Sequence, residues 1–138
     1  MKEHFARVRQ IDTMKRKQFI KGVNQIAQEG AIQIFQEFNT GMEEIIVGVV
    51  GVLQFDVLKF RLESEYGVEI RLEPLPYEYI RWISPESTVD LTRIAGTSDM
   101  KKIKDLKDRP LLLFVNEWSI NMVCERNKGL VLEEFAKN

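Results

Sequence analysis

The chain of 138 residues is 44% hydrophobic and 30% charged, which suits one globular domain or two small units and excludes a large multidomain enzyme. Its formal net charge of −1 provides no overall field for nucleic acid or an anionic membrane, and its longest apolar run, residues 45–55, is shorter than the roughly 20 residues that span a bilayer. The single cysteine cannot form an internal disulfide, which suits a reducing compartment. We therefore expect a cytoplasmic chain with no membrane partner.

The first half of the chain contains alternating strand and helix patterns. Apolar residues recur every second position in the expected strands and every third or fourth position in the expected helices. Pro74 is expected to end the last strand of this half, because proline cannot donate to a ladder. The expected elements are strand 4–10, helix 14–29, strand 31–38, a turn at 39–41, strand 44–51, helix 53–66 and strand 68–73.

The spacing of apolar residues at 53–66 predicts a helix. Gly67 stands where a left-handed cap would end this helix. The residues with this helical spacing are Leu53, Val57 and Phe60, beside Leu58 and Leu62.

The order strand, helix, strand, strand, helix, strand is that of the split βαβ or ferredoxin-like arrangement, an α+β fold with both helices on one face of a four-stranded antiparallel sheet. Residues 44–51 are apolar on both faces, whereas a sheet covered on one side should alternate. We therefore expect a ferredoxin-like subdomain at 1–76 and a smaller α/β subdomain at 77–138 that covers the second sheet face. The expected elements of the latter are strand 79–84, helix 98–106, strand 111–115, helix 117–127 and strand 130–135.

The segment Gly48-Val-Val-Gly51 lies between a strand and a helix, where a phosphate loop would lie. It lacks the lysine and hydroxyl of GxxxxGK[ST], and it carries valines where the GXXG loop of a KH domain favours basic or polar groups. We interpret both glycines as allowing close helix packing.

No group of residues forms a catalytic constellation in this sequence. His4 is the only histidine and has no partner motif, and Cys124 is interpreted as a small buried residue of a helix. The acidic pairs Glu43–Glu44 and Glu133–Glu134 point to opposite strand faces, which is poor geometry for acid–base chemistry. We expect no catalytic, metal or cofactor residue. The aromatic residues expected to pack the junction or the core are Tyr77, Tyr79, Trp82 and Trp118.

The distribution of charge is more informative than its sum, because residues 2–21 carry a net charge of +5 and residues 43–90 a net charge of −6. Three cations, Lys15, Arg16 and Lys17, fall in the first turn of the expected helix, where the positive end of the helix dipole opposes them. They are either tolerated as exposed charges in salt or contact a polyanion such as ribosomal RNA. The candidate contact residues are Lys15, Arg16, Lys17 and Lys21, with Arg7 and Arg9.

Two stretches carry a family resemblance. They are FARVRQIDTMKRKQFIKGVNQIAQEGAIQIF and IIVGVVGVLQFDVLKFRLESEYGVEIRLEPLPYEYIRWI, which together run from Phe5 to Ile83. They closely resemble the C-terminal domain of the bacterial peptide chain release factor 3 family of translational GTPases. More distantly, the order of elements is similar to that of the third domain of elongation factor G.

The resemblance implies a ribosome-docking domain whose parent promotes the departure of class I release factors from the ribosome. It implies contacts with the small subunit, both RNA and protein, and with GTPase and barrel domains of the same parent. The chain contains no guanine-nucleotide motif, so we expect it to be a non-catalytic fragment, with GTP and Mg bound by the GTPase domain of the parent.

The sequence is also compatible with two other functions. Ferredoxin-like sheets also serve as small-molecule regulatory domains, since a fold does not by itself select a function. The equivalent domain of another ribosomal GTPase would share the first half of the chain and differ after Pro76.

Overall fold

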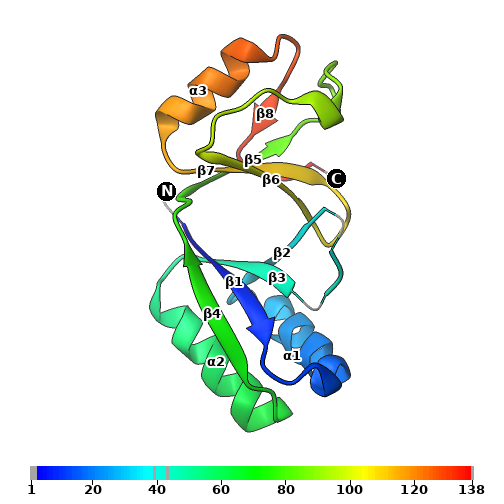
Figure 1. Cartoon of the computed structure of the whole chain (residues 1–138), viewed down its shortest axis with the longest axis vertical. Coiled ribbons are helices and arrows are strands. Elements are labelled where there is room, and N and C mark those ends of the chain that lie inside the picture. Colours follow the sequence, from blue (N-terminus) through cyan, green and yellow to red (C-terminus); the bar gives the residue numbers. More distant parts are fainter. Residues whose placement is uncertain (1–2, 39, 43, 138) are drawn as a thin grey trace. The chain divides into compact units, whose positions relative to one another are not determined.

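The computed structural model describes residues 3–38, 40–42 and 44–137, and it separates into two compact units, Glu3–Leu75 and a second unit from Pro76 onward (Figure 1). Within these residues, no helix combines the length and the apolar character that a membrane span requires. Each unit contributes four strands and contains its own buried apolar residues.

The first unit has the predicted strand–helix–strand–strand–helix–strand order. Its four strands are antiparallel in the spatial order β4-β1-β3-β2, and α1 and α2 pack side by side on one face (Figure 1). The elements are β1 His4–Gln10, the 3-10 turn η1 Thr13–Lys15, α1 Arg16–Gln28, β2 Gln33–Glu37, β3 Glu44–Val49, α2 Leu53–Tyr66 and β4 Ile70–Leu75. The predicted ferredoxin-like α+β fold is confirmed. The expected turn at 39–41 includes Asn39, which lies outside the described residues.

The face of the sheet under the helices holds the main core of this unit. Gly22 lets α1 approach α2, because a Cβ there would stand only 2.7 Å from Leu62 Cδ2. Gly67 ends α2 with φ +67, which confirms the predicted left-handed cap. The buried side chains of this core include Val8, Phe19, Val23, Ile26, Ile34, Ile45, Val47, Leu58, Leu62 and Ile70.

The opposite face of the same sheet is also apolar and buried, as the composition of β3 predicted. Ile46 is fully buried there, and the rings of Phe5 and Phe35 lie 6.2 Å apart between centroids. The prediction that the second unit covers this face stays a prediction.

In α2 the row with Leu58 and Leu62 faces the sheet, while the side chains of Leu53, Val57 and Phe60 are exposed. The expectation that the last strand of this half ends at Pro74 was wrong, because β4 continues through Pro74, which pairs with Ala6. Proline cannot donate a hydrogen bond to a neighbouring strand, and it is tolerated here because β4 is an edge strand with a neighbour on one side only.

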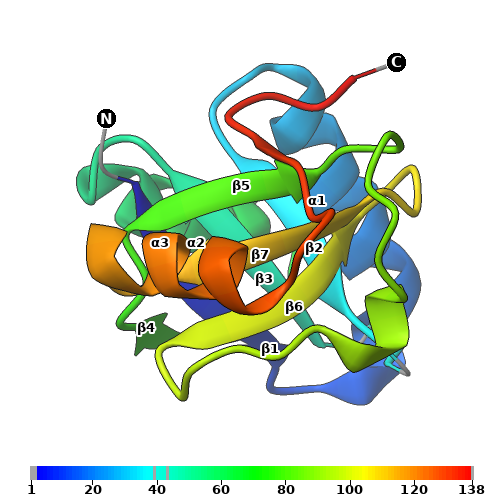
Figure 2. The same ribbon diagram turned by 90° about the horizontal axis from the view of Figure 1, so that it is seen from above.

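The second unit is a small sheet covered by one helix. Its strands are antiparallel in the order β6-β7-β5-β8, and α3 lies on one face (Figure 2). The elements are β5 Tyr79–Ile83, the 3-10 turn η2 Leu91–Arg93, β6 Met100–Asp105, β7 Pro110–Phe114, α3 Glu117–Arg126 and β8 Leu132–Glu133. Ile83, Leu112, Phe114, Val123 and Leu130 form the core beneath α3.

The expected helix at 98–106 is instead the strand β6. Met100, Ile103 and Leu106 have helical spacing in the sequence, but β6 forms a hairpin with β7 in which Ile103 pairs with Leu111. Asp105 stabilises the hairpin turn by accepting hydrogen bonds from the backbone N–H groups of Lys107 and Arg109.

Three further expectations for the second unit differ from the structure. The final strand is only two residues long, Leu132–Glu133. Trp118 and Cys124 lie on the exposed side of α3, because Ser119 and Val123 occupy the positions that face the sheet. The prediction that Trp118 and Cys124 are core residues was therefore wrong.

Candidate nucleic-acid interface

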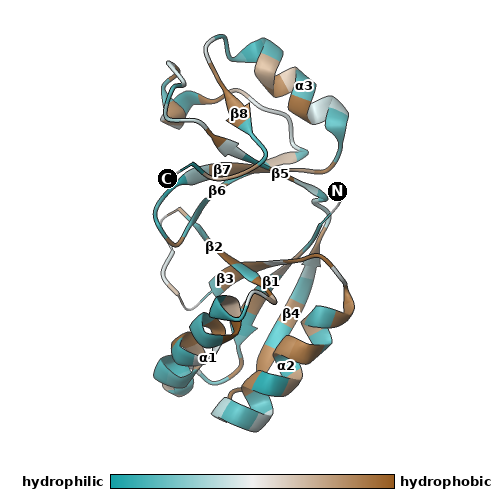
Figure 3. Cartoon of the chain, turned by 180° about the vertical axis from the view of Figure 1, so that it is seen from behind, coloured by the Kyte–Doolittle hydropathy of each residue, from teal (hydrophilic) through white to brown (hydrophobic). Residues whose placement is uncertain are grey.

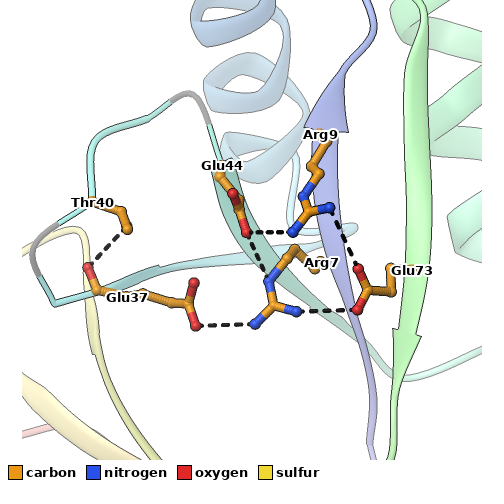
Figure 4. Close-up of polar contacts among 6 residues, drawn as sticks. All are labelled: Arg7, Arg9, Glu37, Thr40, Glu44 and Glu73. Carbon is orange, nitrogen blue, oxygen red and sulfur yellow. Dashed lines mark hydrogen bonds and ion pairs between the residues drawn. The ribbon is translucent and has the colours of Figure 1, made fainter.

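The two predicted arginine contacts, Arg7 and Arg9, lie on β1 among carboxylates. The guanidinium of Arg7 is 3.0 Å from Glu37, 2.9 Å from Glu44 and 3.2 Å from Glu73, on β2, β3 and β4 respectively (Figure 4). Arg9 contacts the same Glu44 and Glu73 at 3.3 and 3.9 Å. Three carboxylates face two arginines, so this cluster presents no net positive potential to a polyanion.

The environment of Arg7 indicates a structural role. Its side chain is 15% exposed, and burial alone would lower the pKa of its guanidinium. The hydrogen bond that Arg7 donates to Glu37 and the charges of Glu37, Glu73 and Glu44 outweigh that effect and raise the pKa. The contact of Arg7 Nε with Glu44 is an electrostatic one without hydrogen-bond geometry. Arg7 therefore links its own strand β1 to side chains of β2, β3 and β4.

The other predicted contacts lie at the start of α1. Asp12 Oδ1 accepts a hydrogen bond from the Met14 N–H at 2.9 Å and so holds the turn that precedes the helix. Lys15 then occupies the N-cap position, and within the described residues no side chain caps α1 and no acid lies in its first turn. The structure thus confirms that the cations stand at the positive end of a helix dipole.

These cations differ in their surroundings. Lys15 is half-buried, and its Nζ would stand 3.8 Å from a Cβ at Gly67, so it lies at the carboxyl end of α2, where a positive charge is favoured. Arg16, Lys17 and Lys21 are exposed. Lys17 and Lys21 are four residues apart and therefore share one side of the helix.

The exposed side of α1 contains only cations and amides. Residues 13–28 include four basic residues and no acid, and Phe19, Val23 and Ile26 turn toward the core. Side-chain amides bind phosphate and sugar oxygens alongside lysine and arginine in protein–nucleic acid interfaces. These amides were not among the residues predicted from the sequence, although the absence of acids from 13–28 was a signal for a face of this kind. The exposed amide side chains beside the lysines are Gln18, Gln25 and Gln28.

The second unit contains a pocket that bears on the small-molecule alternative. Its volume is about 310 Å³, at the lower limit for ligand sites, and it is lined by Trp82, Arg109 and Lys137 among others. Arg109 Nε donates to Asp105 Oδ2 at 2.7 Å, and Lys137 Nζ lies 2.8 Å from Glu133. The cations of this pocket are thus neutralised by carboxylates.

Among the described residues, the remaining candidate catalytic and metal-binding side chains do not form a site together. Partial burial raises the pKa of the Cys124 thiol, which disfavours the nucleophilic thiolate. His4 is exposed on β1. Glu44 pairs with the arginines, while Glu43 lies outside the described residues. In the part of the chain that the structure describes, no three metal-ligating side chains gather to hold an ion.

The class of protein that these observations define is a ferredoxin-like α+β domain in which α1 begins with basic residues. More specifically, the chain belongs to the family described as class II release factor RF3, C-terminal domain, which matches residues 1–124. The family is a domain of a translation-termination factor, and it is not the catalytic domain of that factor.

Three relatives show how far the similarity extends. Peptide chain release factor 3 of Symbiobacterium thermophilum is 45% identical over 135 residues, which is 98% of this chain and 25% of that protein. The proteins of the same name from Gloeobacter violaceus and Listeria welshimeri are both 43% identical, over 97% and 94% of this chain and 25% and 24% of theirs. The chain therefore spans about a quarter of the length of these relatives.

Proposed function

We propose that this domain docks a translation-termination factor on the small ribosomal subunit through the exposed side of α1. The observation that carries the proposal is the acid-free segment 13–28, whose Arg16, Lys17 and Lys21 are exposed together with several amides. Its net positive charge suits ribosomal RNA, because neutralising phosphates releases counterions and so favours binding.

The rest of the proposed function belongs to the longer protein. In this proposal the longer factor binds and hydrolyses GTP with Mg in another part of its chain, works in the cytoplasm and promotes the departure of class I release factors from the ribosome. In this proposal the present domain supplies docking and no catalytic group. Isothermal titration of this chain with GTP is expected to show no saturable binding. A saturable isotherm would contradict the proposal that another part of the longer factor binds GTP.

The test is the salt dependence of binding to purified small subunits. The variant Arg16→Ala/Lys17→Ala/Lys21→Ala omits Lys15, since that lysine also lies at the end of α2. Each phosphate contact contributes about 0.7 to 0.9 to the slope of log K against log salt, so the slope should fall by about 2 to 3. The control changes the net charge equally at three exposed cations elsewhere, Arg71→Ala/Lys107→Ala/Lys128→Ala. Equal slopes for the two variants would refute docking through α1.

A further inference from the structure

The helix α2 carries a second apolar row that its own unit does not cover. Leu53, Val57 and Phe60 are 73%, 50% and 60% exposed, and their spacing places them on one side of the helix. Val50 and Val52, in the turn before α2, are 61% and 58% exposed. We call these five residues the α2 docking face. In Figure 3, hydrophobic colour recurs along the ribbon of α2.

The α2 docking face is separate from the core. At 100° per residue, Leu62 lies half a circle from Leu53, and Leu62 and Leu58 are fully buried against the sheet. The exposed row is therefore not the edge of the buried row. Soluble proteins rarely leave a contiguous apolar patch exposed, and such a patch with a polar rim marks an interaction site.

The rim of this face is acidic. Asp56 and Glu63 line a shallow groove of about 520 Å³ beside Phe60, together with Lys59 and Ser64. On the other flank, Arg61 is bound by both Glu29 and Glu65, at 2.8 and 2.7 Å. These two carboxylates neutralise and exceed the charge of Arg61. Around the apolar row, four carboxylates thus stand against two cations.

We propose that the α2 docking face binds a protein surface that inserts an apolar side chain beside Phe60 and surrounds it with lysine or arginine. The acidic rim repels phosphate and attracts cations, so the complementary partner is a cationic protein segment and not nucleic acid. The proposal rests on the proposed function, because it places this protein partner on the ribosome. It assigns nucleic acid to α1 and protein to α2.

The experiment compares two probes, the intact small subunit and its protein-free RNA. The variant Val57→Ser/Phe60→Ser changes only exposed side chains, so its thermal unfolding should match that of the unmodified chain. Its affinity for intact subunits should fall at least tenfold, as for truncated interface anchors. Its affinity for protein-free RNA should stay unchanged. The control Trp118→Ser/Phe135→Ser removes two other exposed apolar side chains and should bind both probes normally.

Charge reversal tests the predicted chemistry of the partner. Asp56→Lys/Glu63→Lys should weaken binding to intact subunits at low salt, and tighter binding would show an anionic partner and overturn the proposal. Unchanged subunit binding by Val57→Ser/Phe60→Ser overturns the proposal as well. The proposed docking through α1 would still stand in that case, because it depends on the salt slope of the Arg16→Ala/Lys17→Ala/Lys21→Ala variant. Equal losses on both probes would assign this face to RNA.

Three other outcomes also contradict the proposal. Concentration-dependent dimerisation that the Val57→Ser/Phe60→Ser variant abolishes would assign the face to a second copy. Slower hydrogen exchange of α2 in a full-length relative without ribosomes than in this chain alone would assign the α2 docking face to the longer polypeptide. Failure of the unmodified chain to bind subunits at all would overturn both this proposal and the proposed function.

Discussion

The two glycines of Gly48-Val-Val-Gly51 are predicted to respond in opposite ways to alanine. A Cβ at Gly48 would stand 2.9 Å from Phe5 Cε1 and 3.2 Å from Phe35 Cε2, and both rings are fully buried. A Cβ at Gly51 would meet no atom within 4 Å. Neither glycine has a positive φ, so alanine is compatible with the backbone at both positions.

The magnitudes follow from packing and from chain entropy. Overpacking at Gly48 lowers the free energy of unfolding by about 1 to 3 kcal/mol. Replacing glycine by alanine raises it by about 0.4 to 1 kcal/mol, because alanine restricts the unfolded chain. With values near the middle of both ranges, Gly48→Ala should lower the free energy of unfolding by about 1 to 2 kcal/mol. Gly51→Ala should leave it unchanged or raise it by about 0.5 kcal/mol.

Urea unfolding followed by circular dichroism measures both variants. With a urea dependence of about 2 kcal/mol/M, Gly48→Ala should move the midpoint down by about 0.5 to 1 M with an unchanged slope. If Gly48→Ala were as stable as Gly51→Ala, the close packing of β3 against the two rings would be refuted. The result would also separate the two glycines, which the sequence interpretation treated alike.

Three further predictions concern side chains of the two units. Arg7→Met should lower the free energy of unfolding by about 2 kcal/mol, because it leaves half-buried carboxylates without their counter-charge. Arg9→Met removes an exposed pair and should change the free energy of unfolding, measured in urea, by less than about 1 kcal/mol. Burial opposes ionisation of Asp105, but hydrogen bonds from its turn and from Trp82 outweigh burial and lower its pKa below that of an ordinary aspartate. Its stabilisation is therefore present at pH values above the pKa of an ordinary aspartate and is lost as the pH falls through the lower folded pKa. The stability deficit of Asp105→Asn at pH 7 should accordingly shrink in acid melts, and a deficit independent of pH would contradict this assignment. Trp118→Ala should shift the thermal midpoint by no more than an ordinary surface substitution, and a large loss would mean that this ring is packed.

The fold of the first unit was predictable because its elements are long and strongly periodic. The six-element order and the Gly67 cap depend on local patterns, which tertiary contacts did not override. In α2 the pattern was ambiguous, because apolar residues occupy two opposite rows and the sequence does not show which row meets the sheet. Only the packing against β3 and β4 distinguishes Leu58 and Leu62 from the exposed row.

Other features depend on residues far apart in the chain. Arg7 and Arg9 alternate with apolar residues as an exposed strand face would, yet their carboxylate partners come from other strands 30 or more residues away. The strand β6 likewise depends on its pairing with β7. The basic start of α1 was predictable, since it is local in sequence and the helix alone exposes it.

Site-specific photocrosslinking on small subunits tests the central claim most directly, because it identifies what each helix touches. A photoreactive residue at exposed Gln18 of α1 is predicted to crosslink to ribosomal RNA, and one at exposed Val57 of α2 to a ribosomal protein. The contradicting results are the reverse pattern, in which Gln18 crosslinks to protein and Val57 to RNA, and the absence of subunit crosslinks from both positions.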